Sequence, residues 1–213
     1  GQEPPQGHPL RQVYPANVWP AEIPGLEEVA LQLYLSLELC AETLLQALAD
    51  YFSLPQDTFS SMMQNGNSIL RAIHYPPLPE APPAGSVRAA AHEDINLITL
   101  LSESKGSGLE ILTHEGTWKA IGTLDGDIVV DSGDMLSRIT NGVIPATTHR
   151  VVNPEQGINT SRYSIPFFVH PYPTCDLSVM PAFVSEQNPE RFEPISAQEF
   201  LDQRLREIGL LGD

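Results

Sequence analysis

The chain has 213 residues, of which 41% are hydrophobic and 18% charged, and its formal net charge is -16. This length suits one domain with a sizeable core, and no apolar run approaches the roughly 18 residues that a membrane span needs. Acidic residues dominate and Lys and Arg form no cluster, which argues against binding to nucleic acid or to a membrane surface. Cys40 and Cys175 form no CxxC pair, so a reducing cytoplasm fits best.

Helices are expected near both ends of the chain, and strands are expected between them. Residues 1–25 are proline-rich and start at Gly1 without a signal pattern, so we expect irregular structure and a trimmed or incomplete protein. The segment 26–64 is expected to contain a long helix and then a short one capped by Asp57. Ser196 and Glu199 have capping-box spacing and predict a closing helix at 196–210. The predicted buried face of the long helix carries Leu33, Leu37, Cys40 with Ala41, Leu44, Leu48 and Tyr51.

The middle of the chain, residues 68–172, changes to the period of two that is typical of strands. Ile69, Arg71, Ile73 and Tyr75 alternate with their neighbours, and a long proline loop follows. Short β-like runs come next, namely INLITLL, GLEILT, TWKAI, GDIVVDS, DMLSRIT, ATTHRVV and RYSIPFFVH. Most are separated by turn residues, including the hairpin signal Asn141-Gly142. This pattern predicts a sandwich, jelly roll or barrel.

One of these runs, AAAHEDINLITLL, begins with candidate metal ligands. On a strand, His92 and Asp94 would share a face while Glu93 points away. Taken alone, an H-x-D triplet is better explained by a solvated strand end. His149, at the start of a distant β-branched strand, supplies a third ligand. Two histidines and one carboxylate form the facial triad of non-haem Fe(II) oxygenases.

A second candidate site follows on a later strand. Arg162 and Ser164 lie two residues apart in an otherwise apolar run. A core-facing arginine is costly unless it meets an anion, and its planar fork suits a carboxylate. The pair therefore predicts a carboxylate clamp.

The motifs LRAIHYPPLP, HEDINLITLL, GDMLSRITNG, HRVVNP and RYSIPFF occur in this order over roughly residues 65–170. Together they closely resemble the isopenicillin N synthase-like family of 2-oxoglutarate and Fe(II)-dependent oxygenases. The resemblance implies a mostly β fold with flanking helices, a double-stranded β-helix (jelly-roll) barrel in one domain at 1–213, lacking the N-terminal part of the family fold. It implies that His92, Asp94 and His149 bind iron and that Arg162, Ser164 and Tyr75 bind 2-oxoglutarate.

Strand alternation extends the prediction to the substrate side of the site. Arg71 and Ile73 share a face with Tyr75, Val151 shares one with His149, and Phe168 shares one with Arg162 and Ser164. We expect Arg71, Ile73, Val151 and Phe168 to line the cavity. Arg71 would hold an anionic substrate, or else pair with a structural acid.

The function that the resemblance implies is coupling of 2-oxoglutarate decarboxylation to hydroxylation or a related oxidation of a small molecule. Fe(II), 2-oxoglutarate and O₂ are then required, and ascorbate is a candidate co-reductant. A same-family oxidase that does not consume 2-oxoglutarate is one alternative. A truncated, non-catalytic ligand-binding barrel is another. The sequence predicts no oligomeric state.

Overall fold

The computed structural model describes residues 14, 16–78, 83–102, 108–122, 126–154 and 160–212. It divides into two compact units. The first comprises Gly1–Ile69, Val169–Asp176 and Ser196–Asp213, and the second comprises Leu70–Phe168 and Leu177–Ile195. Whether the chain is a single domain, as the sequence predicts, stays a prediction.

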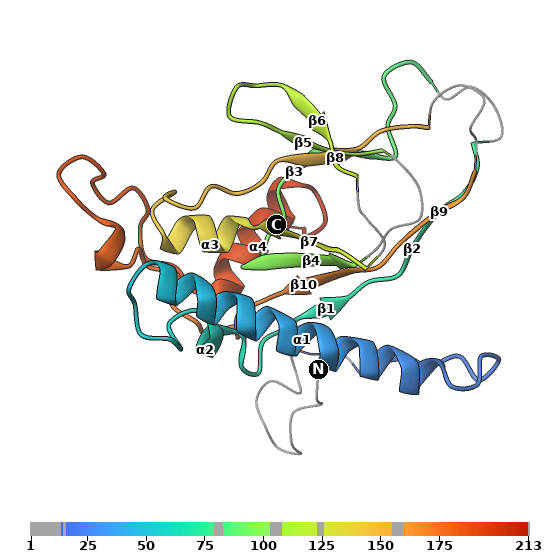
Figure 1. Cartoon of the computed structure of the whole chain (residues 1–213), viewed down its shortest axis with the longest axis horizontal. Helices are drawn as coiled ribbons and strands as arrows, with labels where there is room; N and C mark the ends of the chain where they lie inside the picture. Colours follow the sequence, from blue (N-terminus) through green and yellow to red (C-terminus); the bar gives the residue numbers. More distant parts are fainter. Residues whose placement is uncertain are drawn as a thin grey trace. The chain divides into compact units, whose positions relative to one another are not determined.

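The first unit is largely helical. It contains helices α1 (Leu26–Tyr51), α2 (Ser60–Met63) and α4 (Ala197–Glu207) (Figure 1). The capping box of α4 is confirmed, because the Ser196 hydroxyl accepts from the Glu199 amide and the Glu199 carboxylate accepts from the Ser196 amide. The prediction that Asp57 caps α2 is wrong, since the N-cap residue is Phe59 and no side chain caps the helix.

The buried face of α1 differs from the predicted one. The buried residues are Tyr34, Leu37, Ala41, Leu45 and Ala49. Leu44 is 37% exposed and Tyr51 is 80% exposed, although both were expected to face the core. Apolar residues occupy two neighbouring stripes of this helix, so periodicity alone cannot tell which stripe is buried. Within the described part of the chain, no helix is both long and apolar enough to cross a membrane.

The second unit carries most of the β-structure. Its strands, two of which extend by one residue into the first unit, are β1 (Ile69–Leu70), β2 (Ile73–Tyr75), β3 (Ala89–His92), β4 (Ile98–Ser102), β5 (Leu109–Leu112), β6 (Trp118–Ala120), β7 (Ile128–Ser132), β8 (His149–Val151), β9 (Arg162–Ser164) and β10 (Pro166–Val169). They form sheets in the orders β1-β10-β4-β7, β3-β8-β5-β6 and β2-β9 (Figure 1). The expected mostly-β class is confirmed, but among the described strands these sheets do not close into one hydrogen-bonded barrel.

One predicted strand is a helix. The run DMLSRIT forms α3 (Asp134–Ile139), which buries Met135, Leu136 and Ile139. Their i, i+1, i+4 spacing suits a helix, and a strand would have placed Met135 and Leu136 on opposite faces. The Asn141-Gly142 turn ends this helix instead of joining two strands: both residues have positive φ, and the Gly142 amide donates to the Ser137 carbonyl.

Cross-strand pairing in the sheet β3-β8-β5-β6 aligns its side chains in rows. His92 lies opposite His149, His149 opposite Ile111, and Ile111 opposite Lys119. Directly opposed residues share a face, and we call this side the histidine face. The other side, which carries Arg150, Glu110 and Trp118, is the arginine face. The two faces differ in chemistry.

Candidate functional site

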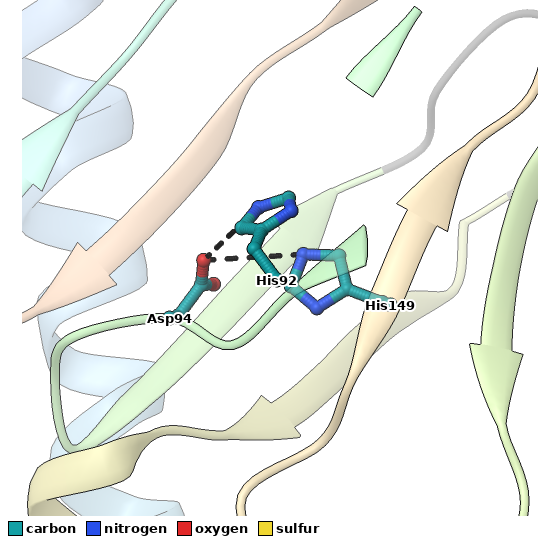
Figure 2. Close-up of side chains that lie close together, drawn as sticks. All are labelled: His92, Asp94 and His149. Carbon is teal, nitrogen blue, oxygen red and sulfur yellow. Dashed lines mark ion pairs between the residues drawn. The ribbon is translucent and has the colours of Figure 1, made fainter. Parts of the chain in front are cut away.

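Three side chains converge where β3 ends. His92 is the last residue of β3, His149 is the first of β8, and Asp94 lies in the segment that joins β3 to β4. Asp94 Oδ1 is 3.8 Å from His92 Nε2 and 3.9 Å from His149 Nε2, and Figure 2 shows the three side chains turned toward one another. One potential ligand atom from each residue lies within 4.8 Å of the others.

The reason for this proximity differs from the prediction. His92 and Asp94 were expected on one strand face, but Asp94 lies beyond the strand end, where the chain leaves one sheet for another. Glu93 does point away, because its carboxylate accepts a hydrogen bond of 2.8 Å from the Thr148 hydroxyl.

Both histidines are oriented by backbone carbonyls. His92 Nδ1 is 2.7 Å from the Ala90 carbonyl oxygen, and His149 Nδ1 is 3.1 Å from that of Thr147. A carbonyl can only accept, so in the neutral form of each ring Nδ1 carries the proton and Nε2 presents a lone pair to the site. This is the tautomer that metal binding through Nε2 requires.

The Asp94 carboxylate is fixed by a short hydrogen-bond chain. Thr99 Oγ1 donates to Asp94 Oδ2 at 2.5 Å, and Asn96 Nδ2 donates to Thr99 Oγ1 at 2.7 Å. The other oxygen, Oδ1, is the one nearest the histidines. The sequence did not reveal Thr99, because its contact with Asp94 depends on the bend between β3 and β4.

The start of α3 supports the same segment through its backbone. The Asp134 amide donates to the Asp94 carbonyl oxygen at 2.8 Å. A Cβ at Gly133 would lie 2.8 Å from that oxygen and 2.2 Å from Asn96 Oδ1. No side chain fits there, which explains the glycine before Asp134 in the GDML motif.

A second carboxyl group lies behind His149. Asp131 Oδ2 is 3.6 Å from His149 Nδ1, and Asp131 is opposite Thr99 in the β4–β7 pairing. Burial, and then the negative charge of Asp94, raises the pKa of Asp131 to about 8. The surroundings of His149 are therefore rich in potential negative charge, which a bound divalent cation would offset.

The donor set suits a particular kind of metal site. Two imidazole nitrogens and one carboxylate oxygen on one side of an ion, with the remaining positions open, is the arrangement used by mononuclear non-haem Fe(II). The His92 side chain is 47% exposed, whereas those of Asp94 and His149 are 7% and 12% exposed. The site is thus open on the His92 side.

The predicted carboxylate clamp lies on the ribbon formed by β2 and β9. Tyr75 is opposite Arg162 and Ile73 is opposite Ser164, so all four share one face. Arg162 and Ser164 are 2% and 5% exposed, and the guanidinium carbon of Arg162 lies 5.2 Å from the centre of the Tyr75 ring. Burial lowers the pKa of Arg162 below its usual value, and the neighbouring Tyr75 opposes that effect.

The predicted substrate-side residues are distributed over several elements. Val151 is buried on the histidine face, two residues beyond His149, and Ile73 is half-buried opposite Ser164. Arg71 is exposed between β1 and β2. Phe168 is half-buried on β10, which belongs to a different sheet from β9, so strand alternation does not run from Arg162 to Phe168. Their roles stay predictions.

Known proteins share this combination of an antiparallel β-fold and a site with two histidines and a carboxylate. Residues 66–171 match the model of the 2OG-Fe(II) oxygenase superfamily. A crystal structure of a 2OG-Fe(II) oxygenase family protein from Caulobacter crescentus is 45% identical with a TM-score of 0.90, and the alignment covers 98% of this chain and 68% of that one. The chain belongs to the 2OG-Fe(II) oxygenase superfamily, as the resemblance implied. The expected Fe(II), 2-oxoglutarate and O₂ are the requirements of this family.

Two further similarities define the extent of the match. A full-length Neurospora crassa protein, crystallised in complex with alpha-KG and thymine, is 29% identical with a TM-score of 0.85, over 98% of this chain and 63% of that one. A 2-oxoglutarate-Fe(II) type oxidoreductase of Aspergillus fumigatus is 30% identical over 89% of this chain and 57% of its own length. The chain thus spans somewhat more than half the length of such curated relatives.

Proposed function

We propose that this protein is a non-haem Fe(II) and 2-oxoglutarate-dependent dioxygenase that couples decarboxylation of 2-oxoglutarate to hydroxylation or a related oxidation of a small organic molecule. One observation carries this proposal. The Nε2 atoms of His92 and His149 converge with Asp94 Oδ1, and both rings are held in the metal-binding tautomer by backbone carbonyls. A solvated strand end would need neither feature.

Each residue of the metal centre has a defined role. His92, Asp94 and His149 would hold Fe(II), which supplies open coordination positions at which 2-oxoglutarate and O₂ can react. Thr99 keeps the second oxygen of Asp94 occupied, so that Oδ1 remains available for the metal. The Ala90 and Thr147 carbonyls keep the histidine protons on Nδ1.

The β2–β9 ribbon would bind the far end of 2-oxoglutarate. The Arg162 guanidinium and the Ser164 hydroxyl donate to its distal carboxylate, and Tyr75 lies beside them. Because Arg162 is buried, water screens its attraction to this carboxylate poorly, and the cost of desolvating the two charges opposes that gain.

On the substrate side we assign Arg71, Ile73, Val151 and Phe168 to the wall of the cavity. The thymine complex of the Neurospora crassa protein supports a small organic molecule as the kind of substrate. The ion pairs of the described residues include none to Arg71, which favours a role in holding an anion over pairing with a structural acid. We also propose that the protein is cytoplasmic, as the cysteines suggest, and that ascorbate serves as a co-reductant.

The test is the fate of 2-oxoglutarate. Purified protein is loaded with Fe(II) under nitrogen and then given O₂, 2-oxoglutarate and ascorbate, which supplies the two electrons that a primary substrate would otherwise give, and succinate, CO₂ and O₂ are quantified. We expect slow uncoupled turnover that forms one succinate per O₂ consumed, and no turnover in Asp94→Ala. Oxygen uptake that is indifferent to 2-oxoglutarate would instead favour a same-family oxidase. Failure of the wild-type chain to bind Fe(II) would favour a non-catalytic barrel.

A further inference from the structure

Lys119 lies on the same sheet face as the two metal-binding histidines. The register places it opposite Ile111, which is opposite His149, which is opposite His92. All four residues therefore form one row across β3, β8, β5 and β6. Two strand spacings, about 10 Å in all, separate the backbones of His149 and Lys119. The flexible four-carbon stem of a lysine can shorten the remaining distance to a molecule bound at the metal.

Lys119 differs from Arg150, on the opposite face of the same sheet, because no acidic side chain in the described structure pairs with it. On the arginine face, Arg150 makes two contacts of 2.7 Å with the Glu110 carboxylate and lies 4.0 Å from the centre of the Trp118 ring. Lys119 instead has the apolar Ile111 opposite it, and the ion pairs among the described residues include none to its ammonium group. Lysine is also scarce: the sequence has only Lys105 and Lys119, against 27 acidic residues.

We propose that Lys119 is a specificity-determining residue that binds a carboxylate group of the primary substrate. The inference rests on the proposed function, since it places that carboxylate beside the metal-bound cosubstrate. An exposed ammonium group in one row with the metal ligands attracts a small anion and would hold it beside His149, at the end of the row away from His92. The competing explanation is that a lysine on the edge strand β6 only prevents pairing with another chain.

The experiment measures how close a simple carboxylate approaches the metal centre. The protein is loaded with Mn(II) and saturated with 2-oxoglutarate under nitrogen, which fills the cosubstrate site. Paramagnetic relaxation of the ring protons is then recorded by NMR for benzoate and for benzamide, its neutral counterpart of the same shape. The variants are Lys119→Gln, Lys119→Arg, and Arg206→Gln, which removes one positive charge from α4 in the other compact unit.

We expect benzoate to be relaxed more strongly than benzamide, and the difference to fall about fivefold in Lys119→Gln, as for loss of one exposed ion pair. Lys119→Arg and Arg206→Gln should retain it. Equal relaxation of the two probes, or an undiminished difference in Lys119→Gln, would overturn the inference and leave the proposed function intact. If wild-type protein failed to bind Fe(II) or 2-oxoglutarate, the proposed function itself would fall, and this inference with it.

Discussion

The two faces of the sheet β3-β8-β5-β6 use similar residues for different purposes. On the arginine face, Arg150 is paired with Glu110 and stacked on Trp118. Thr148, two residues before Arg150, donates a hydrogen bond to the Glu93 carboxylate. On the histidine face, the Nε2 atoms of His92 and His149 and the ammonium of Lys119 are directed to ligands in our account. Polar groups that satisfy one another stabilise the strands, whereas groups left available to ligands carry the function.

The β2–β9 ribbon repeats this division. Its exposed face carries His74 stacked on Tyr163, with ring centres 4.7 Å apart, and Tyr163 is 57% exposed. Its other face carries the buried Arg162 and Ser164. Changes on the ligand-binding faces should therefore affect binding of metal or cosubstrate, and changes on the opposite faces should affect stability.

The largest effect is expected at Arg162. Arg162→Gln removes the cation that would bind the distal carboxylate of 2-oxoglutarate. We expect the KM for 2-oxoglutarate to rise roughly 100-fold, as for loss of one member of a buried charge pair. Tyr163→Leu, next to it but on the exposed face, is the matched control and should change this KM less than about twofold. Succinate formation measures both. An equal rise of the KM for 2-oxoglutarate in the two variants would show that the two faces of the ribbon do not differ in function.

A somewhat smaller effect is expected at Thr99. Thr99→Val keeps the shape of the side chain but removes the hydrogen bond to Asp94 Oδ2. We expect Fe(II) affinity to fall about 10- to 100-fold, as is usual when a group that orients a metal ligand is lost. Competition with a fluorescent chelator measures the affinity. Thr99→Ser should restore it, and an unchanged affinity in Thr99→Val would show that the hydrogen bond does not position the ligand.

Asp131 gives a prediction for pH dependence in the metal-free protein. Its pKa is about 8 when folded, above the ordinary 3.8, so the folded state binds the proton more tightly. The contribution of Asp131 to the free energy of unfolding is fully present below about pH 4 and is lost as the pH rises to about 8. The free energy of unfolding should therefore fall less with rising pH in Asp131→Asn than in wild type. The two proteins should differ in this fall by a few kcal/mol, because one pKa unit is about 1.4 kcal/mol.

Urea unfolding at pH 5 and pH 8 with a chelator present measures this difference between wild type and Asp131→Asn. Groups that do not interact with Asp131 titrate alike in both proteins and cancel in the comparison. If wild type lost no more stability than the variant between these pH values, the carboxyl group would not be protonated as described.

The smallest effect on the metal site is expected from the arginine face. Arg150→Gln breaks the paired contact with Glu110 and the stacking on Trp118, and should lower the free energy of unfolding by about 1–2 kcal/mol. Fe(II) affinity should change less than about twofold. A large loss of affinity would mean that the two faces are not separable, and the variant Arg150→Gln with Glu110→Gln tests whether the unpaired carboxylate is the cause.

The sequence predicted the mostly-β class, the α4 capping box and the convergence of His92, Asp94 and His149, because these follow from periodicity and from family motifs. It did not predict α3, because a segment of six residues with three apolar ones is too short for periodicity to separate helix from strand with certainty. It also missed Thr99 and Asp131, which meet their partners through tertiary contacts. The place of Lys119 depends on strand register, which a single sequence does not specify.

The central claim is that Asp94, and not its neighbour Glu93, completes an Fe(II) site that accepts 2-oxoglutarate. Anaerobic titration of Fe(II) and 2-oxoglutarate, followed by the visible charge-transfer absorption of the chelate, tests it directly in wild type, Glu93→Gln and Asp94→Asn. We predict the absorption band in wild type and in Glu93→Gln, and none in Asp94→Asn. A band that survives in Asp94→Asn, or that disappears in Glu93→Gln, would contradict the account.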